Sequence, residues 1–549
     1  SHGECNNKSV QILEEVRINV EKEIAMDTEL YDHDATGAYG RFLKDPFLGY
    51  DTLEKAIEDC KATSQAEVVA RILNGENVFV SGPAGSGKST VVALVNSILE
   101  DKFKNHFIVA ITASTGLAAS NIGGKTIHSW SGLGIYDGQL SQRGKMDNEA
   151  LGIYRAESNL KYADLLVVDE VSMLHAYYLD NVDTALKRIR KNDRPFGGVQ
   201  VILMGDFMQL PPINPPSHKK KDGLNYGFAI TSRAWKEADI KICYLDKVHR
   251  ASDPDLKHML WKISVGKPDE KTMQMIGKAE ARERDPDKVY SVLFTTNKNV
   301  DAYNKEKLDE NPNDSVYLYP EVYGAKKDYE ELMKQHAVPH ELEMKEGAVV
   351  IVTANNNEVG VFNGTVAKFV RYNKSSDEVV LALNDGRIVN LPKVSRDKEV
   401  KRTKSGAHVA EETLLDEVVF KDVVAAVSYF PIKLGYAITV HKSQGQTFDA
   451  VEVDLSKCFI PGLGYVALSS GRNANDLIIS GFSQKALEVD TDSLKYSRYV
   501  KKKALENRAI FIENIEHYRE VLTSPEKLET LWKIEDSGIS RSLKDLNKK

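Results

Sequence analysis

Residues 82–89 read Gly82-Pro83-Ala84-Gly85-Ser86-Gly87-Lys88-Ser89, with Thr90 next, and they decide how the first half of the chain is interpreted. An apolar run at 77–80 precedes the stretch and another at 91–94 follows it, so the sequence predicts a strand, a glycine-rich loop and a helix. Glycines let backbone N–H groups turn towards phosphate oxygens at the start of a helix. Lys88 would bring a positive charge to the β- and γ-phosphates, and the Ser89 hydroxyl would hold Mg²⁺. The loop therefore predicts a nucleotide-binding site formed by residues 82–90.

The bulk properties are those of a globular protein with several domains. The chain has 549 residues, of which 42% are hydrophobic and 28% charged. No apolar run approaches the ~20 residues that span a bilayer, and no signal peptide is visible. These features favour an intracellular protein, in the cytoplasm or nucleoid if bacterial or phage, and in the nucleus or mitochondrion if eukaryotic. The four cysteines are widely spaced and form no zinc pattern, so reduced structural thiols are expected. The net charge of −7 argues mildly against a broadly basic surface but leaves room for a local basic groove.

The apolar pattern divides the chain into four parts. Short apolar strands alternate with helical stretches in two long sections, which is typical of parallel α/β layers. Between Val379 and Ile388, the turn sequence Asn384–Arg387 separates two apolar runs and predicts a hairpin. We predict a helical extension at 1–60, an α/β domain at 61–240 with an insertion at 134–160, a second α/β domain at 241–485 with a small antiparallel β-barrel inserted at 340–430, and a helical extension at 486–549.

Two further stretches carry chemistry at the ends of predicted strands. The apolar run at 165–168 ends in Asp169 and Glu170, the acid pair that an Mg·ATP site requires. Asp169 would hold Mg²⁺ beside Ser89, and Glu170 would orient and deprotonate the attacking water. Alone, such a pair would be read as a helix cap after a strand. The segment 205–212 follows another apolar run, and its Gln209 is suited to contact the γ-phosphate, because an amide can both donate and accept.

At this point the motifs resemble a known family. Segments of this chain resemble the DNA-contacting, coupling, fifth and sixth motifs of superfamily 1 helicases, at 112–119, 123–130, 205–212, 439–445 and 465–469. The stretch 179–200 is similar to the signature of the Pif family within that group. The resemblance implies two RecA-like parallel-sheet domains with ATP hydrolysis between them, and 5′→3′ movement on single-stranded DNA. It also implies unwinding of duplex or fork DNA and, commonly, action on G-quadruplexes. The insertion at 134–160, as a strand-separating pin, and the inserted barrel match the family's layout.

The resemblance also assigns individual residues. Gln65 resembles the glutamine that reads adenine, and Arg250 resembles the arginine that reaches the γ-phosphate, whose loss costs roughly 10³–10⁵ in rate. Gly445, in the fifth motif, is placed on the nucleotide side. Residues of types suited to phosphate or sugar contacts are candidates for binding the DNA strand: Ser114, Thr115, His128, Thr296, Thr439, His441 and Lys442. Trp130 would stack on a base or pack in the core.

The sixth motif departs from the family pattern. The family usually has Arg directly after the serine that is Ser469 here, whereas this chain has Ser470, Gly471 and then Arg472. Either Arg472 reaches the γ-phosphate from a shifted loop, or Arg250 is the main arginine finger. The fourth motif also has Ala251 where the family often has Gln.

Three alternative functions are distinguishable on sequence. The first, a RecD-like helicase subunit, is disfavoured by the segment 195–198. The second is an NTP-driven switch without translocation, which would have no use for the motifs at 112–130 and 439–445. The third is a DNA-binding module without hydrolysis, which would not need Lys88, Asp169 and Glu170. The resemblance favours a monomer with no membrane association, and the terminal extensions are candidate sites for a protein partner.

Overall fold

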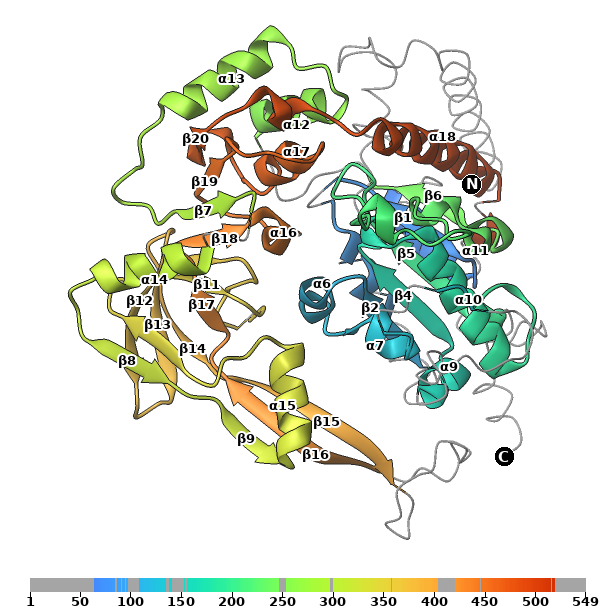
Figure 1. Cartoon of the computed structure of the whole chain (residues 1–549), viewed down its shortest axis with the longest axis horizontal. Helices are drawn as coiled ribbons and strands as arrows, with labels where there is room; N and C mark the ends of the chain where they lie inside the picture. Colours follow the sequence, from blue (N-terminus) through green and yellow to red (C-terminus); the bar gives the residue numbers. More distant parts are fainter. Residues whose placement is uncertain are drawn as a thin grey trace, which may run out of the picture. The chain divides into compact units, whose positions relative to one another are not determined.

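The structure is a computed structural model in which the chain divides into two units (Figure 1). It describes residues 64–83, 86–89, 91–93, 95–96, 108–134, 138–140, 153, 156–245, 253–296, 300–356, 358–402, 420–444, 446–514 and 516–518. The first unit comprises the chain up to Arg250 and again from Val489, and the second comprises Ala251–Glu488. The helical extension expected at 1–60 lies outside the described residues. None of the described helices is long and apolar enough to cross a membrane.

The first unit is built on a six-stranded parallel sheet, as the pattern at 61–240 predicts. Its apolar central strands are buried, which explains why they read as continuous apolar runs rather than as alternating ones. In spatial order the strands are β3 (Lys125–Thr126), β2 (Val109–Ala113), β4 (Leu165–Asp169), β5 (Gln200–Met204), β1 (Val78–Ser81) and β6 (Lys241–Tyr244).

Helices cover this sheet through apolar side chains. The longest described helix before residue 250 is α10 (Ala176–Arg190), whose buried Leu179, Val182 and Leu186 belong to the core over β4 and β5. Other α-helices in the described part of this unit are α4 (Ser64–Leu73), α6 (Gly116–Asn121), α7 (Ile127–Ser131), α9 (Glu157–Tyr162) and α11 (Arg233–Glu237). Of the predicted insertion at 134–160, the described residues at its two ends are anchored to α10. Asn181 Oδ1 accepts from the Leu140 N–H, and Asn181 Nδ2 donates to Gly138 O. The Tyr178 hydroxyl donates to Gly134 O.

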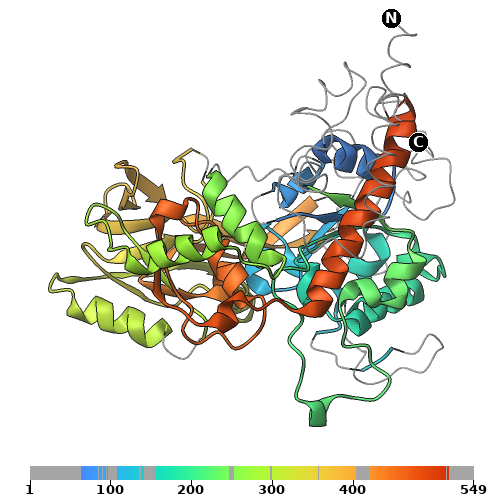
Figure 2. The same cartoon turned by 90° about the horizontal axis from the view of Figure 1, so that it is seen from above.

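A long C-terminal helix, α18 (Thr491–Glu513), belongs to the first unit. Sequence periodicity predicts a helix here but says nothing of where it packs. The helix lies along β6, and its buried Val500 and Ala504 join the core of the first unit (Figure 2). Tyr496 contacts the rings of Phe207 and Phe228 at centroid distances of 6.3 and 5.5 Å. The first unit is therefore assembled from two stretches of chain, one before and one after the second unit in the sequence.

The second unit contains a four-stranded parallel sheet in the order β18-β7-β19-β20. Its strands are β18 (Ala437–Thr439), β7 (Ser291–Phe294), β19 (Val451–Asp454) and β20 (Leu477–Gly481). The second unit also contains the helices α12 (Pro254–Ser264), α13 (Glu270–Ala281), α14 (Val300–Glu310), α15 (Lys326–Gln335), α16 (Val440–Ser443) and α17 (Leu463–Leu468). Both units thus have the parallel α/β layers that the sequence predicts.

The predicted β-barrel at 340–430 is not confirmed by the described strands. The described strands form an open five-stranded sheet in the order β14-β13-β12-β11-β17 and two smaller sheets, β15-β16-β9 and β10-β8. Their bounds are β8 (Ser315–Leu318), β9 (Glu321–Gly324), β10 (Leu342–Lys345), β11 (Val349–Val352), β12 (Val366–Asn373), β13 (Glu378–Leu383), β14 (Ile388–Pro392), β15 (Val394–Arg402), β16 (Phe420–Tyr429) and β17 (Ile432–Leu434).

The reason is the path of the chain after β14. A barrel closes only when every strand is paired on both sides. Strand β14 ends at Pro392, and β15 then pairs with β16 from Val394↔Tyr429 to Arg402↔Phe420. Among the described strands, nothing joins β14 to β17, so both stay as edges. The predicted hairpin between β13 and β14 is confirmed, and Gly386 supplies the positive φ of +86° in its turn.

Candidate functional site

The phosphate loop begins directly after β1, at the carboxyl edge of the first sheet. Gly82 has no room for a side chain, because a Cβ there would lie 2.4 Å from the carbonyl oxygen of Leu245. Lys88 folds back over the loop, and its Nζ donates to Gly82 O at 2.7 Å and Pro83 O at 3.1 Å. The Ser86 hydroxyl is buried and has no hydrogen-bond partner among the described residues. The loop therefore presents a cation and an unsatisfied hydroxyl, groups that a phosphate would satisfy.

The acid pair follows β4, two strands away from β1 in the same sheet. The Asp169 carboxyl is buried, and its Oδ1 accepts a hydrogen bond from the Glu170 N–H at 2.8 Å. Burial raises the pKa of Asp169 above its ordinary value, while that N–H and the Lys88 ammonium act in the opposite direction. Glu170 is held in the left-handed region, at φ 53° and ψ 42°. Such a conformation is uncommon outside glycine and is often kept where it aims a functional group.

A second buried carboxylate, Asp206, joins this group, although the sequence analysis did not single it out. Asp206 follows β5, the strand between β4 and β1, and its Oδ1 accepts from the Met208 N–H at 2.9 Å. Burial raises the pKa of Asp206, and the charges of Lys88 and, more weakly, Lys501 lower it. Its backbone carbonyl accepts from the N–H of Gln209, which is itself buried. The available signal was an acid placed directly after the strand that neighbours the phosphate-loop strand.

These groups fit a magnesium nucleotide. Asp169 and Asp206 are hard oxygen donors, both within the electrostatic reach of Lys88. Magnesium in nucleotide enzymes is usually held by one or two carboxylates together with substrate phosphates. Asp169 and the exposed Ser89 would hold the ion, which would draw charge from the phosphates when bound.

The candidate DNA contacts of the first unit lie at the same sheet edge. Ser114 and Thr115 follow β2, which pairs with β4, and His128 lies in α7 after β3. The Ser114 hydroxyl donates to Glu170 O at 2.7 Å, and its N–H donates to Asp169 O at 3.0 Å. Ser114 is therefore tied to the turn that carries the acid pair. Burial lowers the pKa of His128, whose ring lies 4.5 Å from that of Tyr178.

In the second unit, the candidate DNA contacts gather at the carboxyl ends of β7 and β18. These strands are parallel neighbours, with Phe294 opposite Thr439. Thr296, which follows β7, and α16, which follows β18, therefore lie at the same edge of the sheet. The buried Thr439 caps α16, and its Oγ1 accepts from the Lys442 N–H at 3.2 Å. Lys442 is exposed, and burial lowers the pKa of the half-buried His441. Thr439 thus has a capping role, and His441 and Lys442 are the more accessible residues.

Comparison with known proteins decides the family. Residues 60–267 match the sequence model of the PIF1-like helicases. The ATP-dependent DNA helicase Pif1 of Psychrobacter sp. is 34% identical over 83% of this chain and 73% of its own length. The chain belongs to the PIF1-like helicase family. The PIF1 helicase of Danio rerio is 30% identical, and this chain spans only 64% of its length.

Solved structures of this family have a similar fold. Bacteroides Pif1 in complex with ADP-AlF4 superimposes with a TM-score of 0.66 at 25% identity, over 81% of this chain and 98% of that one. Bacteroides Pif1 bound to single-stranded DNA gives a TM-score of 0.52 at 25% identity, over 82% and 97%. The likeness identifies the two parallel sheets as those of an α/β RecA-like helicase fold.

The stretch that resembles the Pif signature has a packing role in this PIF1-like helicase. Asp183 on α10 accepts from the Phe196 N–H at 2.6 Å, and Arg190 donates to Gly197 O at 2.9 Å. Arg190 also donates to Lys161 O, in the last turn of α9, and to Ala163 O, just after that helix. A Cβ at Gly197 would lie 2.7 Å from Leu186 O. The signature therefore clamps α10 to the end of the inserted segment.

Other predicted site residues are placed less directly. Ala84, Gly85, Thr90, Arg250 and Gly445 lie outside the described residues. Gln65 lies in the first turn of α4.

Trp130 and Arg472 are described. Trp130 is buried in the core of the first unit, with 6% of its surface exposed, which favours packing over base stacking. Arg472 follows α17 in the second unit, and its Nη1 pairs with Asp449 Oδ1 at 2.6 Å.

Proposed function

We propose that this PIF1-like chain is an ATP-dependent DNA helicase that moves 5′→3′ along single-stranded DNA and unwinds duplex, fork and G-quadruplex DNA. Its relatives are ATP-dependent DNA helicases by name, and Bacteroides Pif1 has been solved with ADP-AlF4 and with single-stranded DNA. Lys88 would bind the phosphates, Asp169 would hold Mg²⁺, and Glu170 would accept the proton of the attacking water. The monomeric state, the pin function of 134–160 and a protein partner for the terminal extensions are part of the same proposal.

One observation carries the coupling of hydrolysis to DNA. Ser114, in a predicted DNA-contacting motif, donates to Glu170 O and Asp169 O through its hydroxyl and its N–H. A strand bound at Ser114 and Thr115 would therefore act directly on the turn that orients the catalytic acids. Since Glu170 is held in an uncommon backbone conformation, small shifts of this turn would change the aim of its carboxylate.

The coupling predicts an ATPase that responds to single-stranded DNA. We expect the rate of ATP hydrolysis to rise at least about tenfold when an unstructured oligonucleotide is added, and Ser114→Ala to lose most of that rise. A coupled-enzyme ATPase assay over a range of oligonucleotide concentrations measures this, with Lys88→Ala as the blank. An unchanged rate would instead favour an NTP-driven switch, and hydrolysis absent in all conditions would favour a plain DNA-binding module.

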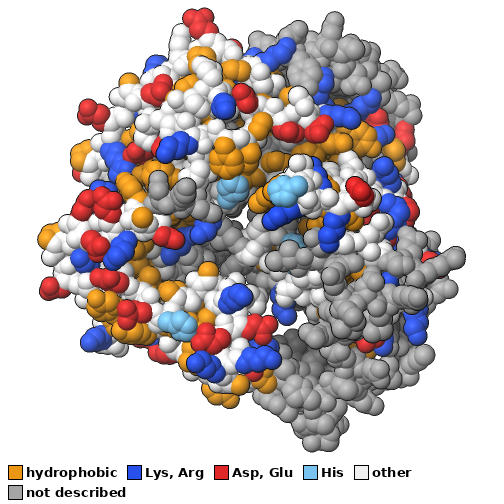
Figure 3. All heavy atoms as spheres, viewed as in Figure 1, with side chains coloured by type: hydrophobic (Ala, Val, Ile, Leu, Met, Phe, Trp, Pro, Cys, Tyr) orange, Lys and Arg blue, Asp and Glu red, His pale blue; other side chains and the backbone are white. Residues whose placement is uncertain are grey.

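DNA affinity should depend on salt and on pH. Figure 3 shows acidic and basic side chains interspersed over the described part of the face in view, so attraction to phosphate at this face has to come from local contacts. Since burial lowers the pKa of His128 and His441, both rings are neutral at neutral pH. Because both pKa values lie below the ordinary value, protonation requires acidification below about pH 6.5, and a bound phosphate favours the protonated form. Affinity is therefore expected to rise as the pH falls.

Fluorescence anisotropy with a labelled oligothymidine at constant ionic strength measures this pH dependence. We expect an increase of up to about tenfold for each histidine whose pKa rises by one unit on binding. The double variant His128→Asn with His441→Asn should flatten the profile. An equally steep profile in that variant would assign the pH dependence to other groups.

A further inference from the structure

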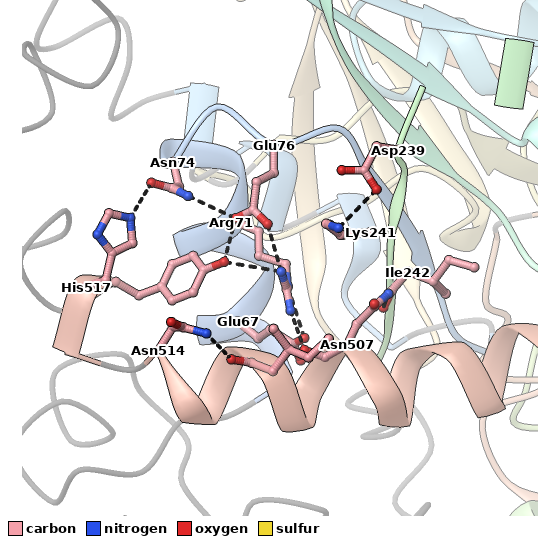
Figure 4. A network of polar contacts seen from close by, with 12 residues as sticks. Glu67, Arg71, Asn74, Glu76, Asp239, Lys241, Ile242, Asn507, Asn514 and His517 are labelled. Atoms are coloured by element: carbon pink, nitrogen blue, oxygen red, sulfur yellow. Dashed lines mark hydrogen bonds and ion pairs between the residues drawn. The ribbon is translucent and has the colours of Figure 1, made fainter. Parts of the chain in front are cut away.

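Three charged side chains are completely buried where α18 meets α4. Glu67, Arg71 and Arg508 have 0%, 2% and 1% of their surface exposed. Both oxygens of Glu67 are used: Oε1 accepts from Arg71 Nε at 3.2 Å (Figure 4), and Oε2 accepts from Arg508 Nε at 3.0 Å. The two partners of Glu67 come from positions 4 and 441 residues away in the sequence.

The network continues to the end of the described chain. Arg71 donates to Glu76 Oε1 at 2.8 Å and to the Asn507 carbonyl oxygen at 2.5 Å. Tyr518 donates to Glu76 Oε2 at 2.8 Å, and its ring lies under the Arg71 guanidinium. Two arginines are thus matched by two glutamates, so the buried charge is balanced, and the loss of one partner would leave another uncompensated.

Arg508 also reaches the phosphate side of the nucleotide site. Its Nη2 donates to the Tyr244 carbonyl at 2.8 Å, at the end of β6. The next residue, Leu245, donates its N–H to Ser81 O at 2.8 Å and presses its carbonyl against Gly82. One guanidinium therefore connects the first turn of α4 with the strand end that confines the phosphate loop.

A second side chain of α18 acts on the same region. The charge of Lys501 lowers the pKa of Asp206, and its Nζ lies 5.5 Å from the centre of the Tyr244 ring. Apolar contacts through Val500, Ala504 and Phe511 already attach the helix to the first unit. The buried ion pairs therefore do more than attach the helix. They fix the position of α18 relative to α4 and β6, because they form only when the three elements are in register.

We propose that α18 sets the geometry of the nucleotide site and that Arg508 is a positioning residue for recognition of the nucleobase. Glu67 lies two residues after Gln65, so the ion pair with Arg508 holds the helical turn that contains Gln65, the residue proposed to read adenine. This inference rests on the proposed nucleotide site of the first unit. It makes adenine selectivity depend on a residue that is more than four hundred positions away from Gln65 and does not touch the nucleotide.

The test compares Arg508→Met and Arg508→Lys with Lys503→Ala in the full chain. Lys503 is a matched control, because it lies on the same helix and pairs with Glu506 near the surface. Calorimetric binding of ADP and GDP gives the base preference without DNA or turnover. Steady-state ATP hydrolysis then gives KM and kcat separately.

We expect Arg508→Met to lower the preference for ADP over GDP by about tenfold and to raise KM for ATP similarly, with kcat changed by less than about threefold. Arg508→Lys should have an intermediate effect, since one ammonium cannot hold both Glu67 and Tyr244 in the geometry of a guanidinium. Lys503→Ala should match the wild type.

A folded Arg508→Met with unchanged base preference would overturn the proposal. If Arg508→Met does not fold, Arg508→Lys decides in the same way. Because ADP and GDP binding requires no helicase activity, a wild type that binds ADP but is not stimulated by DNA would refute the proposed function while leaving this inference testable.

Discussion

Replacing Glu170 by Gln is expected to lower kcat for DNA-stimulated ATP hydrolysis by roughly 10²–10⁴, the usual contribution of a general base. The substitution keeps the size and one acceptor oxygen of the side chain but removes the group that takes the proton from water. Asp169 and Lys88 remain, so KM for ATP should change little. Steady-state kinetics at saturating single-stranded DNA measure both quantities.

The matched control is Glu237→Gln, a half-exposed acid of the first unit that pairs with Arg233 away from the phosphate loop. It should leave kcat unchanged. If Glu170→Gln kept more than about half of the wild-type kcat, the base would have to be another group, with the buried Asp206 as the first to be tested.

Arg250→Ala is expected to have a still larger effect, roughly 10³–10⁵ in kcat, if Arg250 is the main arginine finger. Arg472→Ala should lower kcat by at least about tenfold if this second arginine also contacts the γ-phosphate. The ion pair of Arg472 with Asp449 does not preclude that role. Both side chains are about half exposed, at 47% and 45%, and such surface pairs contribute little free energy.

Single-turnover hydrolysis of the two variants, side by side, ranks the two arginines. Asp449→Asn is the companion variant, since it releases Arg472 without removing it and should leave kcat equal or slightly higher. An unchanged kcat in Arg472→Ala would exclude Arg472 from hydrolysis. Near-normal hydrolysis in Arg250→Ala would transfer the finger role away from Arg250.

Local chemistry explains what could be predicted from the sequence. The parallel sheets follow from apolar runs too continuous for one-sided strands, and the hairpin at 384–387 follows from its turn residues. The Asp169–Glu170 pair could be recognised because the strand before it, the acids themselves and the phosphate loop are each a short, contiguous pattern in the sequence. The structure brings these groups together through strand order, which places β5 beside β1 and β4 next to β5.

Tertiary contacts explain what could not be predicted. The pairing of Arg508 with Glu67 spans most of the chain, and nothing in the periodicity of α18 reveals it. The predicted barrel is not confirmed, because hairpin signals specify neighbours but not whether the last strand returns to the first. Trp130 has the same residue type whether it stacks on a base or packs in a core, and only its burial distinguishes the two.

The most direct test of the account is unwinding of three labelled duplexes with Mg·ATP, one with a 5′ single-stranded tail, one with a 3′ tail and one blunt, with Lys88→Ala as the control. The account predicts strand release from the 5′-tailed duplex alone, lost in Lys88→Ala. Release from the 3′-tailed duplex would contradict the proposed direction of movement.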